Sequence, residues 1–315
     1  MRPFAAETID RGAGCWSRRR MSTFAHILLA GPTASGKSHL ALELAAQHGG
    51  VIVNADSMQV YRDLRILTAR PSREDEAAAP HRLYGHVPAA TRYSVGRWLG
   101  DVAAVLAETR REKRPAIVVG GTGLYFKALT EGLTAVPAIP AEVRAAIGAE
   151  SAGVATPELH ARLAVLDPED AAALRVGDRS RVLRALEVVT ATGRSLAEWH
   201  RTAAAPPLVD PAAATRIVLM PERAELHRRI AARAERMLEQ GAMAEVEGLL
   251  ALGLDPELPA MKAIGVRELG AHRAGTMTRA EALAQIATET RRYAKRQMTW
   301  FRNQMADWPQ SAGAA

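Results

Sequence analysis

The stretch HILLAGPTASGKSHLALELA, residues 26–45, decides the fold of the first part of the chain. An apolar run from Ile27 to Leu29 stops at Gly31, and a helical pattern begins near Lys37, so the spacing G-x-x-x-x-G-K-S stands between a predicted strand and a predicted helix. Gly31 and Gly36 allow backbone angles that aim successive N–H groups inward, where the positive end of the helix favours an anion. The stretch therefore predicts a loop that binds a diphosphate or triphosphate.

The side chains of this loop add to the predicted site. Lys37 supplies a positive point charge, and the Ser38 hydroxyl can ligate Mg²⁺. The predicted phosphate-binding residues are Gly31, Pro32, Thr33, Ala34, Ser35, Gly36, Lys37 and Ser38. The alternative is a glycine turn between strand and helix that binds no ligand. The motif thus indicates the class of ligand but leaves the reaction open.

Composition limits the class of protein. The chain has 315 residues, of which 48% are hydrophobic and 24% charged, so it can bury a substantial core. No apolar run approaches membrane-spanning length, and the single cysteine, Cys15, excludes a disulfide framework. A formal net charge of +7 suits a polyanionic partner, although an arginine-rich chain can be basic from composition alone. We expect a monomer in the cytoplasm, without membrane association.

The chain beyond the loop alternates short apolar runs with helical patterns, as a parallel sheet with crossover helices would. Alanine-rich helical stretches without strand signals follow from about Thr134 to Gly177. We predict an α/β fold, with a P-loop NTPase-like parallel sheet flanked by helices and a small all-helical insertion domain. The predicted parts are a disordered or non-native extension at 1–22, a core at 23–133 and 178–306, the insertion at 134–177, and a disordered tail at 307–315.

Asp56 is the strongest candidate for chemistry outside the loop. The segments GVIVNADS (50–57) and PAIVVGGTGLY (115–125) are predicted strands whose carboxyl ends carry Asp56, Ser57 and Thr122, at the edge where open α/β sheets bind ligands. An ordinary P-loop NTPase has a Mg²⁺-binding aspartate after a second apolar strand, where IVVGGT has glycine. Asp56 can therefore hold a metal or remove a proton, or simply cap the turn that follows.

Basic residues gather on three predicted helices. Arg181 and Arg184 share one face of the first, and Arg229 and Arg233, one turn apart on the second, could point together at an anion. On the last helix, 281–304, the cations lie opposite an apolar stripe and are Arg291, Arg292, Lys295, Arg296 and Arg302. Tyr293 and Trp300 lie among these cations and could stack on exposed bases or cover the core. The alternative for the first and the last of these helices is a solvated face, and for Arg229 and Arg233 it is a structural ion pair.

Eight segments in this order resemble the tRNA dimethylallyltransferase family. They are GPTASGKS (31–38), NADSMQVYRDLRILTARPS (54–72), PHRLYGHV (80–87), YSVGRW (93–98), VVGGTGLYFKALTEGL (118–133), RVLRALEV (181–188), MKAIGVREL (261–269) and AKRQMTWFRNQ (294–304). The resemblance covers essentially residues 25–304. GPTASGK alone would fit many kinases, whereas DSMQVY, GGTGLY and KRQMTWFR at these separations are specific to the family.

The resemblance implies a reaction and a set of roles. The loop would hold the diphosphate of dimethylallyl diphosphate with Mg²⁺, and the five-carbon group would pass to N6 of the adenosine 3′ of the anticodon in tRNAs reading codons that begin with U. Asp56 would be the general base, with Thr33 and Arg233 beside the leaving group. Residues implied to contact the tRNA anticodon stem-loop are Asp56, Ser57, Met58, Gln59, Thr122, Arg144, Arg181, Arg184, Lys262, Gly265, Arg267, Lys295, Arg296, Gln297, Thr299, Trp300 and Arg302.

Two positions depart from the family pattern, and three other functions share parts of the sequence. Ser180 stands where the family often has glutamine, and Val266 where many members have tyrosine. A small-molecule kinase would share the loop and sheet, and an RNA-binding nucleotide sensor would share the basic helix. An adenylate isopentenyltransferase acting on free nucleotides would not need that C-terminal helix, so the helix favours tRNA.

Overall fold

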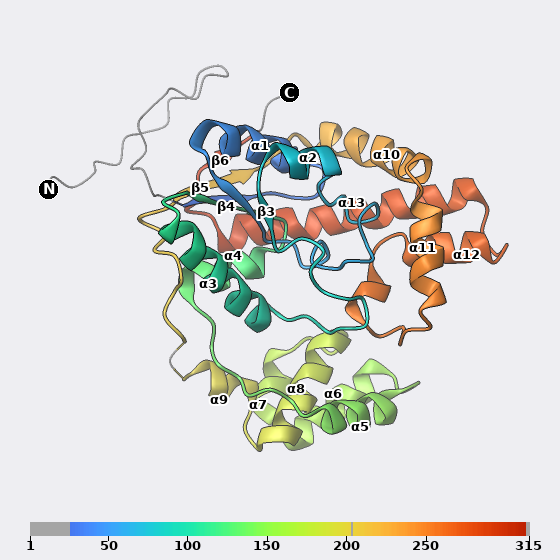
Figure 1. Cartoon of the computed structure of the whole chain (residues 1–315). Helices are drawn as coiled ribbons and strands as arrows, with labels where there is room; N and C mark the ends of the chain where they lie inside the picture. Colours follow the sequence, from blue (N-terminus) through green and yellow to red (C-terminus); the bar gives the residue numbers. More distant parts are fainter. Residues whose placement is uncertain (1–25, 203, 313–315) are drawn as a thin grey trace, which may run out of the picture. The chain divides into compact units, whose positions relative to one another are not determined.

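The computed structural model describes residues 26–202 and 204–312 (Figure 1). These residues form two compact units. One contains the described residues up to Lys127 and from Val209 onward, and the other is Ala128–Leu208. No helix in the described part of the chain is both long and apolar enough to cross a bilayer.

The first unit is built on a parallel sheet, which confirms the predicted α/β fold. Its strand order is β3-β2-β4-β1-β5-β6, and every pair is parallel. The strands are β1 (Ile27–Ala30), β2 (Val51–Asn54), β3 (His81–Arg82), β4 (Ala116–Gly120), β5 (Thr215–Leu219) and β6 (Gln310–Ser311). The residues of β1, β2 and β4 are all buried, which explains why these strands read as continuous apolar runs.

Helices complete the first unit. They are α1 (Lys37–His48), α2 (Arg73–Ala78), α3 (Val95–Arg111), α10 (Arg223–Glu239), α11 (Ala242–Ala251), α12 (Val266–Arg273) and α13 (Arg279–Gln304), with a 3-10 helix η1 (Pro259–Lys262). Ile27 and Leu29 of β1 pack with Ala41 and Ala45 of α1 in one core. In Figure 1 the long helix α13 (red) runs beside α10 and α12, and its Ala287 and Ala294 pack with Ile230 of α10. The last helix is thereby built into the unit that carries the loop.

The second unit is larger than the predicted insertion of residues 134–177. Helix α4 (Gly123–Glu131) runs from the first unit into it, and its own helices are α5 (Ala141–Ser151), α6 (Thr156–Leu166), α7 (Pro168–Ala173), α8 (Arg179–Thr192) and α9 (Leu196–His200). The expected return to the core at residue 178 is corrected, because Val182, Ala185 and Leu186 of α8 pack with Ile147, Leu159 and Leu163 in one cluster. The sequence shows the apolar stripe of α8, but the partners of that stripe are α5 and α6.

The predicted disordered tail at 307–315 is also wrong for residues 307–312. Strand β6 pairs with β5, and the Met220 N–H donates to the Ser311 carbonyl at 2.7 Å. Trp308 is buried and meets Phe126 edge-on, with 5.7 Å between ring centroids. A two-residue strand shows no periodicity, so the sequence carries no sign of it. Residues 313–315, and the predicted extension at 1–22, lie outside the described residues.

Candidate active site

The loop between β1 and α1 surrounds a buried cation. Gly36, the residue just before α1, lies in the left-handed region with φ 90°, which favours glycine. The Lys37 ammonium donates to the Pro32 carbonyl at 3.2 Å and is almost fully buried. The pKa of Lys37 is lowered to about 8, chiefly by burial; the Asp56 carboxylate opposes this shift, and Arg233 adds to it. An anion bound in the loop would therefore restore the charge of Lys37.

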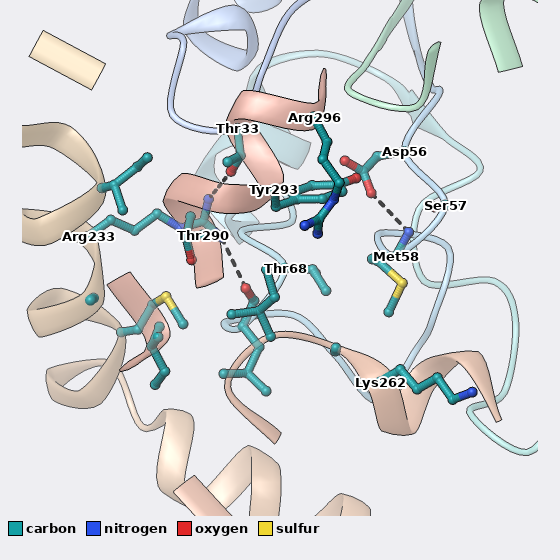
Figure 2. A pocket seen from close by; sticks show the side chains of 17 residues that line it. Thr33, Asp56, Ser57, Met58, Thr68, Arg233, Lys262, Thr290, Tyr293 and Arg296 are labelled. Atoms are coloured by element: carbon teal, nitrogen blue, oxygen red, sulfur yellow. Dashed lines mark hydrogen bonds between the residues drawn. The ribbon is translucent and has the colours of Figure 1, made fainter. Parts of the chain in front are cut away.

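Two side chains from distant helices hold Thr33 of this loop. Arg233 Nη1 on α10 donates to Thr33 Oγ1 at 2.8 Å, as Figure 2 shows. Gln297 on α13 accepts from the Thr33 N–H at 2.9 Å, and its own Nε2 donates to the Gly121 carbonyl at 2.9 Å. A Cβ at Gly121 would lie 2.2 Å from that nitrogen, so only glycine permits this approach. Gln297, expected at the tRNA, is thus buried and clamps the loop to the end of β4.

Both predicted arginines of α10 reach the anion loop, since Arg229 Nη1 donates to the Ser35 carbonyl at 3.5 Å and Arg233 holds Thr33. Arg229 Nε pairs with Glu225 Oε1 on its own helix at 2.6 Å. Arg233 is half-buried, and its second nitrogen, Nη2, donates to the Leu67 carbonyl at 3.0 Å. Burial lowers the pKa of Arg233 and the Asp56 carboxylate opposes this, but a guanidinium stays protonated in either case. Arg233 therefore presents a fixed positive charge beside Thr33.

Asp56 follows β2 and is fixed by its neighbours. The Asp56 N–H donates to Asn54 Oδ1 at 2.8 Å, and Asn54 Nδ2 donates to the Asp56 carbonyl at 2.9 Å. Trp98 Nε1 holds the Asn54 carbonyl at 2.8 Å. Asp56 Oδ1 accepts the Met58 N–H at 2.9 Å, so the carboxylate does cap its turn while also lining a cavity. The two interpretations of Asp56 left open by the sequence are therefore compatible.

That cavity has a volume of about 270 Å³ and two kinds of wall (Figure 2). Its charged lining comes from Asp56, Arg233, Lys262 and Arg296. Its apolar lining includes Leu67, Ile230, Ala234, Met237, Ile264 and Ile286. A cavity of this size suits a small ligand with an anionic head and an apolar group.

Helix α13 turns one of its predicted outward cations toward this cavity. Arg296 lines the cavity, with its guanidinium carbon 5.7 Å from the centroid of the Tyr293 ring, so it does not share a purely external face with Lys295. Burial, and then the Asp56 carboxylate, raise the pKa of Tyr293, so its hydroxyl stays protonated. Lys295, Thr299 and Arg302 are exposed. The helix thus has a buried face, a cavity face and an exposed face.

The other predicted tRNA contacts have varied partners in the first unit. The Ser57 N–H donates to Thr122 Oγ1 at 2.9 Å, which ties the ends of β2 and β4 together. Lys262 pairs with Glu257 at 2.7 Å, and Arg267 with Glu268 at 3.3 Å. Gly265 caps α12 with φ 106°. Trp300 packs against Gly123, where a Cβ would lie 2.0 Å from its ring, so this indole covers protein.

The remaining three predicted contacts lie in the second unit. Arg144 and Arg184 both pair with Glu187, at 3.6 and 3.5 Å, and Arg181 pairs with Asp178 at 3.3 Å. Arg181 is the most exposed of them, with 69% of its side chain accessible. All three are therefore partly neutralised where they stand.

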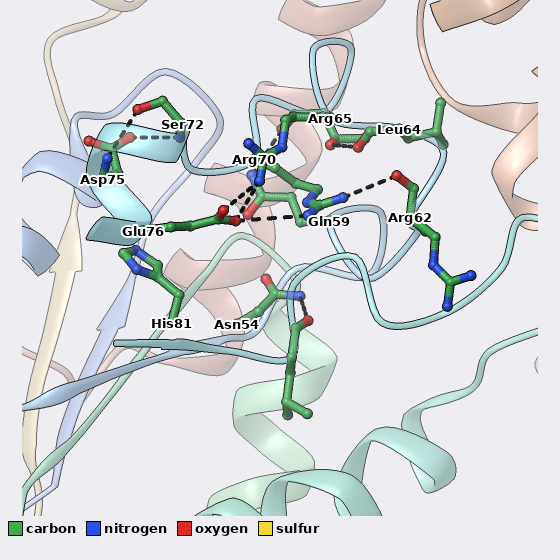
Figure 3. A network of polar contacts seen from close by, with 12 residues as sticks. Asn54, Gln59, Arg62, Leu64, Arg65, Arg70, Ser72, Asp75, Glu76 and His81 are labelled. Atoms are coloured by element: carbon green, nitrogen blue, oxygen red, sulfur yellow. Dashed lines mark hydrogen bonds and ion pairs between the residues drawn. The ribbon is translucent and has the colours of Figure 1, made fainter. Parts of the chain in front are cut away.

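Sequence reasoning missed how the segment 59–70 is organised (Figure 3). Gln59, expected at the tRNA, donates Nε2 to the carbonyls of Thr68 and Ala69 at 2.9 and 3.0 Å. Arg70 donates to the Tyr61 and Arg62 carbonyls at 3.3 and 3.2 Å. These are side-chain to backbone bonds without a fixed sequence pattern, so no motif could have indicated them.

The fold and the cavity define a P-loop-type α/β protein in which an anion loop faces a carboxylate and an apolar wall. The family model described as IPP transferase matches residues 59–304, and a second, described as Isopentenyl transferase, matches residues 25–86. The chain belongs to the IPP transferase family, whose members are prenyl-transferring enzymes.

Relatives and solved structures agree with this assignment. The chain is 56% identical over 282 residues to a tRNA dimethylallyltransferase of Bradyrhizobium sp. (strain ORS 278), covering 90% of this chain and 91% of that protein. A tRNA dimethylallyltransferase of Methylobacterium nodulans is 58% identical, covering 90% and 93%. The Bacillus halodurans tRNA isopentenylpyrophosphate transferase has a TM-score of 0.64 at 31% identity, covering 91% and 89%. A eukaryotic dimethylallyltransferase acting on tRNA has a TM-score of 0.74 at 26% identity, covering 91% and 73%.

Proposed function

We propose that this protein transfers a dimethylallyl group from dimethylallyl diphosphate to N6 of an adenosine in tRNA, with release of diphosphate. The observation that carries the proposal is the cavity, in which Thr33 and the positively charged Arg233 mark an anion-binding end, an apolar wall follows, and the Asp56 carboxylate is part of the same lining. The similarity to proteins named tRNA dimethylallyltransferase supports this choice of substrates.

Asp56 is the proposed general base. The N6 lone pair of adenine is delocalised into the ring, so the amine attacks C1 of the donor efficiently only if its proton is removed as the bond forms. Asp56 is held by Asn54 and by the Met58 N–H, so its carboxylate can take that proton without first reorienting. The proton passes to Asp56 and the electron pair of the breaking C1–O bond goes to diphosphate.

The loop stabilises the leaving group. Negative charge grows on the bridging oxygen as the C1–O bond breaks. Lys37 is a buried cation of the loop, and the half-buried Arg233 lies against Thr33. Fixed charges in a dry site stabilise developing charge with little reorganisation. The apolar residues, among them Ile230, Ala234 and Met237, surround the five-carbon group and exclude water from C1.

Mg²⁺ is proposed to be held by the exposed Ser38 hydroxyl together with oxygens of the donor. The described residues contain no group of three or more His, Cys, Asp or Glu side chains placed to hold a metal. A single hydroxyl suits an ion that usually keeps several waters and binds through substrate phosphates. When bound, Mg²⁺ would neutralise charge on the diphosphate.

The proposed acceptor is the adenosine 3′ of the anticodon in tRNAs reading codons that begin with U. A base must leave its stack to reach a cavity, which costs least in a single-stranded loop. The exposed Lys295 and Arg302 of α13 offer cations to the phosphates around it. We propose that the protein acts as a monomer in the cytoplasm.

Incubation with labelled dimethylallyl diphosphate and unmodified tRNA tests the proposal. Label should pass to tRNA, and diphosphate should be released in equal amount. An arm with free adenylate tests the second candidate, an adenylate isopentenyltransferase, and an arm with ATP and tRNA tests a kinase. Phosphoryl transfer from ATP without prenylation would overturn the proposed function.

A further inference from the structure

We propose that Glu245 is a positioning residue that holds Arg233 through the backbone of Leu67; the inference rests on the function proposed above. Glu245 projects from α11 and accepts three consecutive backbone N–H groups. Its Oε2 accepts from Arg65 and Ile66 at 2.7 Å each, and its Oε1 accepts from Leu67 at 2.9 Å. One carboxylate therefore fixes the start of the segment that walls the cavity.

Leu67 is held from both sides of its backbone. Its N–H donates to Glu245, and its carbonyl accepts from Arg233 Nη2 at 3.0 Å. Arg233 Nη1 reaches Thr33 Oγ1 at 2.8 Å. A chain of hydrogen bonds thus connects Glu245 to the anion loop through the Leu67 backbone. The orientation of the Arg233 guanidinium therefore depends on the position of the Leu67 carbonyl.

The surroundings leave Leu67 little freedom to compensate for a missing anchor. Its side chain is buried and lines the cavity, and a Cβ at Gly265 would lie only 2.6 Å from Leu67 Cδ2. Arg65 pairs with Glu76 at 2.6 Å, and Gln59 holds the carbonyls of Thr68 and Ala69 (Figure 3). These contacts fix the Arg65 side chain and the carbonyls of Thr68 and Ala69, whereas Glu245 fixes the backbone N–H groups of residues 65–67.

A carboxylate suits this role better than an amide. Two oxygens carrying a full charge make stronger hydrogen bonds to three N–H donors than neutral acceptors would. In Glu245→Gln one oxygen becomes an NH₂ group, which cannot accept and meets an N–H instead. The segment then moves, and the Leu67 carbonyl no longer fixes Arg233.

Arg233 acts on charge that grows in the transition state, so its misplacement should affect kcat more than KM. We expect Glu245→Gln to lower kcat on the order of 10- to 100-fold, with less than about a threefold change in KM for dimethylallyl diphosphate. Glu247→Gln is the matched control, because Glu247 lies on the same helix, is half-exposed and pairs with Arg273 at 3.5 Å. It should leave both constants unchanged.

A double-mutant cycle separates positioning from general structural damage. If Glu245 acts through Arg233, Glu245→Gln should lower kcat by less than about threefold when Arg233 is already replaced by alanine. The same loss of kcat in both backgrounds would overturn the inference. If Glu245→Gln does not fold, the cycle is run with Glu245→Asp, which keeps the charge but shortens its reach.

Two measurements do not depend on prenylation. Inorganic diphosphate already carries the charge that the donor develops only during transfer, so its affinity should fall about tenfold in Glu245→Gln. The amides of Arg65, Ile66 and Leu67 should exchange hydrogen faster than in the Glu247→Gln control. Unchanged diphosphate affinity and unchanged exchange would overturn the role of Glu245, whereas a wild-type protein that binds diphosphate but does not prenylate tRNA would contradict only the proposed function.

Discussion

At the scale of single residues, Asp56 joins a structural task to a chemical one. Asparagine at this position keeps an oxygen that can accept the Met58 N–H, so the turn survives, but it cannot take a proton from N6. We expect Asp56→Asn to keep donor and tRNA binding and to slow the single-turnover transfer by roughly 10² to 10⁴. Asp255→Asn, which alters an exposed carboxylate paired with Arg92, is the control. Near-normal single-turnover transfer would remove Asp56 from the role of base.

Lys37 gives donor binding a pH dependence with a defined sign. Burial lowers the pKa of Lys37 from 10.5 to about 8, so the free protein loses this charge as the pH rises through 8. A bound diphosphate raises that pKa, so binding takes up a proton above about pH 8 and the affinity falls as the pH rises further. Calorimetry in two buffers of different ionisation heat measures the uptake. Lys37→Met should show only the proton uptake of the ligand itself; equal uptake in both proteins would contradict the role of Lys37.

At the scale of elements, α13 serves three environments at once. Its exposed Lys295 and Arg302 lie seven positions apart and therefore on one face. Replacing both by alanine should lower the slope of log tRNA affinity against log salt by roughly 0.7 to 0.9 units for each phosphate that the protein no longer neutralises. Donor affinity should stay the same, because neither residue lines the cavity.

The control for this helix is Arg292→Ala, which removes an exposed cation already paired with Glu289 at 2.6 Å. Its salt slope should change less than that of the double variant. An unchanged slope in the double variant would mean that this face is only solvated, and an enzyme acting on free nucleotides would then become the better account.

Gln297 on the same helix should matter to the loop instead of to tRNA. Gln297→Leu leaves the Thr33 N–H and the Gly121 carbonyl without their partner, in a place where Gln297 is only 5% exposed. We expect a loss of roughly 1 to 3 kcal/mol in the free energy of unfolding, together with weaker diphosphate binding. Denaturant unfolding and calorimetry measure the two effects. Gln304→Leu, at an exposed position of α13, is the control and should show neither effect. If Gln297→Leu instead loses tRNA binding and keeps its diphosphate affinity, Gln297 contacts tRNA, as the sequence analysis predicted.

At the scale of the whole molecule, the anion loop belongs to only one of the two units. Every residue of the anion loop lies in the first unit, whereas Leu163 is fully buried in the core of the second. Leu163→Ala should cost roughly 2 to 5 kcal/mol in the second unit and leave inorganic diphosphate affinity unchanged. Helical circular dichroism during heating, followed with and without diphosphate, tests this. Leu166→Ala, at a position 49% exposed, is the control and should have the melting temperature of the wild type. A loss of diphosphate affinity in Leu163→Ala would contradict the expectation.

The sequence predicted those parts of the fold and candidate site whose residues are neighbours along the chain. Residues 31–38 and Asp56 lie in short contiguous motifs next to apolar strands, so the sequence alone indicates them. The positions of Gln297 and Glu245 depend on partners 264 and 178 to 180 residues away, and periodicity contains no information about such pairs. The same holds for helix α8: its apolar stripe predicts that the helix packs against another element, but the sequence does not indicate which element.

The bond between Thr33 and Gln297 also has a consequence for synthesis of the chain. A ribosome releases the N-terminal part of a protein first, and 264 positions separate these two residues. The nascent chain therefore carries its complete P-loop motif long before the side chain that fixes the Thr33 N–H exists. If the Thr33–Gln297 bond strengthens donor binding as proposed, we expect that binding to reach full strength only after residue 297 has been synthesised.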